Sequence, residues 1–206
     1  MYKRQPKRTI ENTTVNLTKA CNVLAAWDRR FNSESRGAVL FREWITQYSA
    51  DETSIGSSLF QQPFNPMEAA TTPAGLANTE LALDRLARAK LMLEAEGIGL
   101  DTALGNLQIG HRSERQYPIH GGNRHEGIAN LQMSTTVGNN PTETPVFTGS
   151  DEFAGDSKGL SKSGYNVVHG SSFIMTLGWN DAGPEAEAIL SYSQSGDPES
   201  PHFEDQ

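Results

Sequence analysis

Apolar residues recur every three or four positions along two stretches near the start of the chain, as they do on one face of a helix. The first stretch covers residues 17–27, where Asn16 or Thr18 is placed to cap the start of a helix. The second covers residues 37–48, with Ser35 placed to cap it. The segment between them is polar. The pattern therefore predicts two consecutive helices joined by a polar connection.

A third helix is predicted by the clearest periodic stretch in the sequence. Asn78 or Thr79 is placed to cap its start, and Gly97 suits the left-handed position just beyond its end. Before it, residues 49–78 lose the helical period and contain three prolines, so we expect a long loop with a short helix at residues 67–70. The apolar stripe of the third helix consists of Ala82, Leu86, Ala89 and Leu93.

After Gly97, short β-like runs alternate with Gly, Asn and Pro turns. Helices followed by antiparallel strands predict an α+β fold. We divide the chain into a disordered basic stub (1–14), a helical subdomain (15–97) and an antiparallel β segment (98–206), with a long excursion at 138–163. The expected strands are residues 107–109, 128–133, 165–169, 172–179 and 186–192, with a turn at 180–184 between the last two.

The composition indicates a globular protein that is thin in core-forming residues. Of its 206 residues, 36% are hydrophobic, and Leu, Ile, Val and Phe together make up about 20%, at the lower edge of what folds unaided. The longest apolar run, residues 23–27, is far shorter than the roughly 20 residues of a membrane span. The basic N-terminus is followed by a polar stretch, so we expect no signal peptide within this sequence.

The formal net charge of −8 is concentrated at one end of the sequence. Residues 151–206 contain ten acidic residues and two lysines, whereas residues 1–150 contain fifteen residues of each sign. An acidic half repels phosphate, which argues against nucleic-acid binding. A single cysteine, Cys21, excludes an internal disulfide and a multi-cysteine zinc site.

Histidine and carboxylate residues offer one candidate metal site. His120, His125 and Glu126 share a Gly-rich stretch, with His111 nine residues before His120. Such side chains bind zinc or iron, but zincins place two histidines four apart on a helix, which the glycines at 121 and 122 disfavour. We favour a solvated or turn-stabilising role and keep a His/Glu metal hydrolase as the weakest hypothesis.

Nucleophilic side chains give no complete catalytic set. Cys21 lies on an apolar helix stripe without a neighbouring cation, which indicates a buried small hydrophobe. Serines occur at residues 170–172 (GSS) and 193–196 (SQSG), but neither segment has the Gly-x-Ser-x-Gly form of a nucleophile elbow. We interpret both as turns at strand ends. Phosphate-binding glycine motifs are absent from the sequence.

Several segments, in the same order, resemble the penicillin acylase family of N-terminal-nucleophile hydrolases, and most of all its acyl-homoserine lactone and aculeacin acylase branch. The most specific stretch is QSGDP (194–198) with SPHF (200–203) and DQ (205–206), which is similar to a signature near the C-terminus of the family's β subunit. Ser193 stands where the family usually has glycine, and Phe203 where it usually has tyrosine. The other similar segments are residues 20–28, 35–44, 99–108, 118–122 and 170–173.

The resemblance implies part of an αββα Ntn-hydrolase fold, made as a precursor that cuts itself into an α and a β subunit. In that family the β subunit begins with a serine whose own α-amine acts as the base. The resemblance places this nucleophile, the oxyanion donors and a family calcium site upstream of Met1. It therefore implies no catalytic or metal residue within residues 1–206 and no cofactor there, and it leaves the substrate-binding residues unknown. It also implies a sequence truncated at its C-terminus relative to the family.

Our first hypothesis is therefore a scaffold fragment of an amidohydrolase that removes an acyl group from an acyl-homoserine lactone, a penicillin or a lipopeptide. Its expected partners are the rest of the β subunit, the α subunit and a small acyl amide, without nucleic acid or membrane. The resemblance implies a periplasmic or secreted protein. The alternative is a stand-alone α+β binding or structural module without catalysis.

Overall fold

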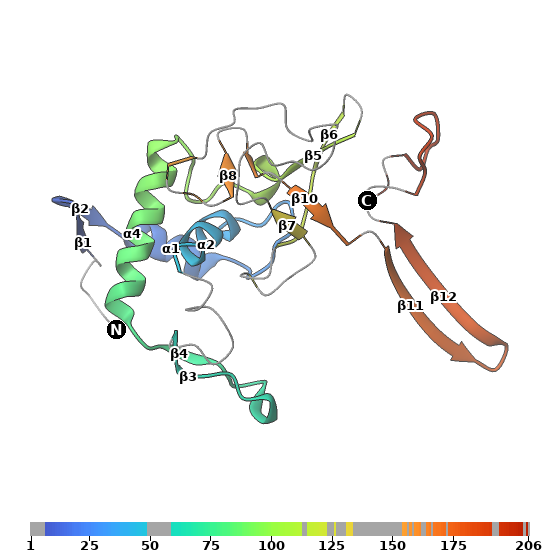
Figure 1. Cartoon of the computed structure of the whole chain (residues 1–206), viewed down its shortest axis with the longest axis horizontal. Coiled ribbons are helices and arrows are strands. Elements are labelled where there is room, and N and C mark those ends of the chain that lie inside the picture. The colour runs from blue at the N-terminus through green and yellow to red at the C-terminus, as the bar shows by residue number, and fades with distance from the viewer. Residues whose placement is uncertain are drawn as a thin grey trace.

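The computed structural model shows an α+β protein in which helices come before most of the antiparallel strands, as predicted (Figure 1). The helices are α1 (Thr18–Ala26), α2 (Ala38–Ile45) and α4 (Thr79–Ala95). The structure describes residues 7–48, 59–112, 115–122, 126, 131–133, 154–155, 157, 159–161, 164–165, 167–171, 173–190, 194–203 and 205.

The two ends of α4 are those that the sequence predicts. The side-chain oxygen of Asn78 accepts a hydrogen bond from the backbone N–H of Leu81 at 2.9 Å. At the other end Gly97 has φ +70°, and the N–H of Ile98 returns to the carbonyl of Leu93 at 2.8 Å. This return bond is the Schellman arrangement that a left-handed glycine permits. Local residue chemistry therefore determines both ends.

The starts of α1 and α2 depart in part from expectation. Leu17, and neither Asn16 nor Thr18, is the N-cap of α1 and makes no side-chain cap bond, although Asn16 accepts a bond from the N–H of Thr18 at 2.8 Å. Ser35 does not cap α2, because its hydroxyl contacts the carboxylate of Asp28 at 3.2 Å instead. Gly37, with φ +102°, occupies the N-cap position of α2 without any side-chain bond.

The core lies where α4 packs on α2, with α1 against α2. All four residues of the predicted α4 stripe are buried. Trp44 on α2 donates its indole N–H to the carbonyl of Ala82 on α4 at 2.9 Å, which ties the two helices together. The aromatic side chains that accompany this contact form a series of ring pairs through Phe31, Trp27, Phe41, Trp44 and Tyr48.

Residues 7–14, which we expected within a disordered stub, form strands instead. β1 (Lys7–Ile10) pairs with β2 (Thr13–Asn16) in an antiparallel hairpin that packs on α4. Arg8 on β1 forms ion pairs with Glu80 at 2.7 Å and Asp84 at 3.3 Å, both on α4. The hairpin therefore depends on a partner more than 60 residues away, which local composition does not reveal.

The loop expected at residues 49–78 also contains structure in its described part. β3 (Phe60–Gln62) pairs with β4 (Ala74–Leu76), and the expected short helix is the 3₁₀ turn η1 (Pro66–Glu68). A second 3₁₀ turn, η2 (Leu104–Asn106), precedes β5.

Within the described residues, the second half of the sequence forms four antiparallel pairs. Each of the five expected strands shares residues with an observed strand, but the boundaries differ. Residues 107–109 shift most, because β5 begins only at Ile109. The pairs are β5 (Ile109–Arg112) with β6 (Arg115–Pro118), β7 (Leu131–Met133) with β10 (Val167–Gly170), β8 (Leu160–Ser161) with β9 (Gly164–Tyr165), and β11 (Phe173–Asn180) with β12 (Gly183–Leu190).

The β11–β12 hairpin extends away from the helices (Figure 1). Every residue of β11 is exposed, and so is nearly all of β12. Among the described residues, no helix has both the length and the apolar character needed to cross a membrane.

Candidate functional site

A charged pair lies inside the apolar stripe of α2. Arg42 and Glu43 are each only 1% exposed, although they are neighbours in a helix of eight residues. The start of α2 packs tightly against the residue that follows α1. A Cβ added at Gly37 would come within 2.7 Å of the Trp27 Cβ atom. Glycine at this position therefore lets the start of α2 lie against Trp27.

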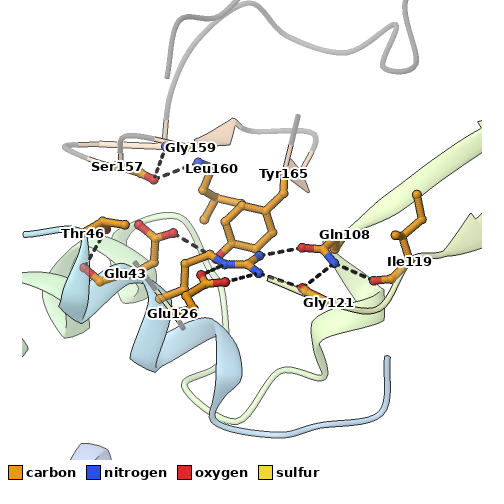
Figure 2. Close-up of polar contacts among 11 residues, drawn as sticks. Glu43, Thr46, Gln108, Ile119, Gly121, Glu126, Ser157, Gly159, Leu160 and Tyr165 are labelled. Carbon is orange, nitrogen blue, oxygen red and sulfur yellow. Dashed lines mark hydrogen bonds and ion pairs between the residues drawn. The ribbon is translucent and has the colours of Figure 1, made fainter. Parts of the chain in front are cut away.

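The guanidinium of Arg42 is bound by groups from the second half of the sequence. Its Nη1 donates to Oε1 of Gln108 at 2.8 Å, and its Nη2 donates to the carbonyl of Gly121 at 3.3 Å. Nε and Nη2 pair with the two carboxylate oxygens of Glu126, the Nη2 contact being 3.1 Å. Figure 2 shows these groups converging on the guanidinium. A fork-shaped arginine suits such a carboxylate geometry.

Two aromatic rings complete the surroundings of Arg42. The centre of its guanidinium lies 4.3 Å from the centroid of the Tyr165 ring and 5.5 Å from that of Phe31. Both distances lie within the range of cation–π attraction, which is strongest where the cation is desolvated. We call Arg42, Glu43, Gln108, Glu126 and Tyr165 the Arg42 cluster.

Gln108 connects the cluster to the backbone after β6. Its side-chain nitrogen donates to the carbonyls of Ile119 at 2.7 Å and Gly121 at 3.1 Å, while its oxygen accepts from Arg42. The residue is fully buried. Each of these bonds satisfies a group that would cost free energy if it were buried alone. Gln108 therefore fixes the 119–121 segment against α2.

Glu43 is the least compensated member of the cluster. One carboxylate oxygen accepts a hydrogen bond from the Tyr165 hydroxyl at 2.9 Å, and the other is buried without a hydrogen-bond partner among the residues that the structure describes. Burial raises the pKa of Glu43 above its ordinary 4.5, although the Tyr165 hydroxyl and the charge of Arg42 oppose this. Burial likewise raises the pKa of the Tyr165 phenol well above 10.0.

The charges of the Arg42 cluster balance when Glu43 is protonated. Arg42 and Glu126 form a buried ion pair, with side chains 2% and 0% exposed. A second buried carboxylate charge would have no cation of its own. Four hydrogen bonds from the guanidinium go to protein groups. The geometry therefore shows a tie between distant segments and not a pocket that holds a ligand.

An open groove of about 810 Å³ lies between the start of α1 and the end of α4. Two of its cations are already engaged. Lys90 pairs with Glu94, and Arg36 donates to the carbonyl of Asp101 at 2.9 Å. Both cations therefore already have a partner within the protein.

The sequence relationships of the protein identify its family. The family model described as penicillin amidase matches residues 3–206. The protein belongs to the penicillin amidase family. This confirms the resemblance that its motifs indicate.

Two of its curated relatives are acylases. Aculeacin-A acylase of Actinoplanes utahensis is 32% identical over 208 aligned positions, which cover 100% of this chain and 22% of the relative. The acyl-homoserine lactone acylase PvdQ of Pseudomonas syringae pathovar tomato is 29% identical over 196 positions, covering 92% of this chain and 22% of the relative. The 206 residues thus span about a fifth of the length of the penicillin amidase family members that they match.

Of the candidate metal residues, the structure describes the side chains of His120 and Glu126, and neither is placed as a metal ligand. Glu126 pairs with Arg42, and His120 is exposed. His111 belongs to β5, and His125 lies outside the described residues. In the described ranges, no group of three or more His, Cys, Asp or Glu side chains is placed to bind a metal ion.

The candidate nucleophiles take structural positions where the structure describes them. Cys21 is partly buried on α1 against the core, and burial raises the pKa of its thiol. Ser195 accepts a hydrogen bond from the N–H of Asp197 at 3.1 Å, which confirms the turn predicted there. Ser171 follows β10, whereas Ser172 and Ser193 lie outside the described residues.

The family's C-terminal signature folds as a closed loop after β12. The N–H of Gln194 donates to the carbonyl of His202 at 3.2 Å, and the Gln194 side chain bonds both backbone groups of Leu190. His202 contacts Asp205 at 2.7 Å. Phe203, which replaces the usual tyrosine of the family, is buried.

The sequence analysis missed the Arg42 cluster. A signal was present, because Arg42 and Glu43 interrupt an otherwise apolar helix face. Their partners lie 66 to 122 positions away in the sequence. The pairing therefore becomes visible only in the folded protein.

Proposed function

We propose that these residues are a scaffold segment of a hydrolase that removes an acyl group from an amide. The proposed substrate is an acyl-homoserine lactone, a penicillin or a lipopeptide. The observation that carries the proposal is the continuous match to one family over residues 3–206, with curated relatives named as acylases. Because the match spans 22% of each of these two relatives, we assign the activity to a longer polypeptide.

The proposed nucleophile is an N-terminal serine in a segment preceding Met1. An α-amine has an ordinary pKa near 8, so a serine at the start of a polypeptide has its own base at working pH. Donors from the same outside segments would stabilise the oxyanion. We assign no catalytic role to a residue within 1–206, and Arg42 and Glu126, the most deeply buried ion pair among the described residues, are occupied by each other.

The family's calcium site is also assigned to outside segments. Calcium needs six or more oxygen ligands, several of them carboxylates. The described residues offer no fitting cluster, and the buried Glu126 already binds Arg42. We therefore propose that segments outside residues 1–206 bind the calcium ion.

The proposed partners are the remaining part of the β subunit and the α subunit of a self-cleaving precursor. We place the assembled protein in the periplasm or outside the cell, as in the family to which it belongs. Nucleic acid and membrane are not among the proposed partners. Residues 151–206 contain ten acidic residues and two lysines. This negative charge repels phosphate and supports the exclusion of nucleic acid.

The test is the polypeptide translated from the whole reading frame that contains these residues, hereafter the full-frame product. We expect mass spectrometry to find it cut into two pieces, the second beginning with serine. Replacing that serine with alanine should abolish both cleavage and hydrolysis of a chromogenic acyl amide. A reading frame that encodes only these 206 residues would contradict the proposal and favour a stand-alone binding module.

A further inference from the structure

The short strands β8 and β9 are held together by bonds within their own stretch of sequence. Leu160 pairs with Tyr165, and Ser161 pairs with Gly164. The Ser161 hydroxyl donates to the carbonyl of Gly164 at 2.8 Å, and the Ser157 hydroxyl accepts from the N–H of Leu160 at 2.8 Å. We call β8, β9 and Ser157 the β8–β9 turn. Because these bonds are local, they persist if the turn moves as a unit.

Tyr165 connects the β8–β9 turn to two distant segments. Its N–H donates to the carbonyl of Leu107 at 2.9 Å, and its hydroxyl donates to Glu43 on α2 at 2.9 Å. Its ring also lies over the guanidinium of Arg42, and Figure 2 shows the side chain directed at these two α2 residues. Tyr165 is fully buried, so the turn is docked on α2 through this side chain.

The carboxyl of Glu43 lies where α2 meets the β8–β9 turn. The titratable and charged groups that face it are Arg42 on its own helix, Glu126, and Tyr165 on β9. Glu126 already neutralises Arg42, and burial keeps the Tyr165 phenol uncharged because it raises the phenol pKa. A negative charge on Glu43 would therefore lack a counterion of its own among the described residues. Burying such a charge costs far more free energy than burying the protonated carboxyl.

Movement of the β8–β9 turn is the least disruptive way to bring an ionised Glu43 to water. Freeing Arg42 instead would break its bonds to Glu126 and Gln108, which come from two separate segments. The turn keeps its internal bonds when it moves and gives up the bonds of Tyr165. Folded proteins open locally in such units at a lower free energy than that of global unfolding.

We propose that the proton on Glu43 latches the β8–β9 turn onto α2, so that loss of this proton releases the turn while the helices stay folded. The inference goes beyond the proposed function and does not depend on it, because it concerns contacts within the folded chain alone. The closed form is the one in which Tyr165 bonds Glu43, and the open form is the one in which Glu43 reaches water.

The direction of the pH dependence follows from which form holds the proton. Burial raises the pKa of Glu43 in the closed form, whereas a hydrated Glu43 in the open form returns to its ordinary 4.5. Between these two values the closed form binds one more proton. The open population therefore rises by about tenfold per pH unit in this window and is constant above it.

Hydrogen exchange of the full-frame product, followed by mass spectrometry, measures the opening. Peptides that contain Tyr165 report the turn, and peptides from α4 report the core. Protection is taken relative to the unfolded chain at the same pH, because exchange itself depends on pH. A local opening exposes little surface and responds weakly to urea, whereas global unfolding responds strongly.

We expect the Tyr165 peptides to be less protected than those of α4 and nearly insensitive to low urea. Their protection should fall by about tenfold per pH unit as pH rises above 4.5. Equal protection and equal urea dependence of the two sets of peptides would overturn the inference, because the turn would then open only with the whole fold. A reading frame that encodes only these 206 residues leaves the measurement unchanged.

Two variants test the role of Glu43 itself. Glu43→Gln keeps an acceptor for Tyr165 without a titrating proton, so the turn should lose its pH dependence. Glu199→Gln changes an exposed carboxyl and should keep it. Tyr165→Phe retains the ring over Arg42 and removes the hydroxyl bond, which should lower the protection of the turn by about two- to tenfold. Persistence of the pH dependence in Glu43→Gln, or unchanged protection in Tyr165→Phe, would overturn the inference.

Discussion

The guanidinium of Arg42 lies 4.3 Å from the centroid of the Tyr165 ring, which joins α2 to β9 across more than half of the sequence. The same side chain pairs with Glu126 and donates to Gln108. The ring, the carboxylate and the amide come from three separate segments. Arg42 therefore couples the helical part of the protein to its strands through one buried charge.

Replacing Arg42 with alanine should strongly destabilise the fold. The change leaves the Glu126 carboxylate buried without its cation and the Gln108 amide without a donor. Breaking a buried pair in this way costs about 3–5 kcal/mol. Urea unfolding of the full-frame product measures the effect. Arg30→Ala is the matched control, since an exposed arginine side chain is expected to change stability by at most about 0.5 kcal/mol. Equal effects of the two changes would contradict the role assigned to the Arg42 cluster.

Glu43 should make stability fall as pH rises above 4.5. Burial raises the pKa of this carboxyl in the folded state, with Arg42, Glu126 and Tyr165 facing it. The folded state therefore binds more protons than the unfolded state between 4.5 and the raised pKa. The stability contribution is complete below 4.5 and is lost as pH rises through the raised value.

Glu43→Gln keeps a hydrogen-bond acceptor for the Tyr165 hydroxyl and removes the titration. We expect this variant to lose that pH dependence and to be at least as stable as the parent at pH 8. Urea midpoints between pH 4.5 and 8 measure both, with exposed Glu199→Gln as the control. A variant less stable than the parent at pH 8 would show that Glu43 is ionised in the fold.

Gly37→Ala should cost more stability than Gly97→Ala. Both glycines have positive φ, +102° and +70°, so both changes carry a backbone cost of about 1–2 kcal/mol. A Cβ at Gly37 also meets the Trp27 Cβ atom at 2.7 Å, whereas one at Gly97 has nothing within 4 Å. Thermal unfolding of the two variants checks the order. Equal losses would mean that α1 and α2 separate without cost.

The 206-residue chain alone should bind a hydrophobic dye strongly and tend to aggregate. Leaving even about 400 Å² of apolar surface exposed forfeits on the order of 10 kcal/mol, comparable to the stability of a whole domain. Trp179→Ser should reduce dye binding, because Trp179 is an aromatic residue of β11 that is 73% exposed, whereas Thr176→Ser should not. A dye-silent monomer with a sharp melting transition would indicate a complete domain.

Purified protein should contain well under one equivalent of zinc, and a chelator should leave its melting unchanged. Glu126, the carboxylate beside the candidate histidines, is paired with Arg42. Stoichiometric zinc that disappears in a His120→Ala, His125→Ala double variant would revive the metal-hydrolase hypothesis.

Features set by neighbouring residues were predictable from the sequence. The Asn78 cap, the Gly97 stop and the buried stripe of α4 follow from side-chain chemistry within a few positions. The hairpin at residues 7–16 was not predictable, because Arg8 finds its carboxylates on α4. The Arg42 cluster is a stronger case, since a charged pair in an apolar helix face indicates burial but does not name its partners.

The most direct measurement is the steady-state hydrolysis of an acyl-homoserine lactone by the full-frame product and by the 206-residue chain, side by side. Our account predicts turnover by the full-frame product and none by the 206-residue chain. Turnover by the 206-residue chain that is lost on replacing one of its own residues would contradict the account.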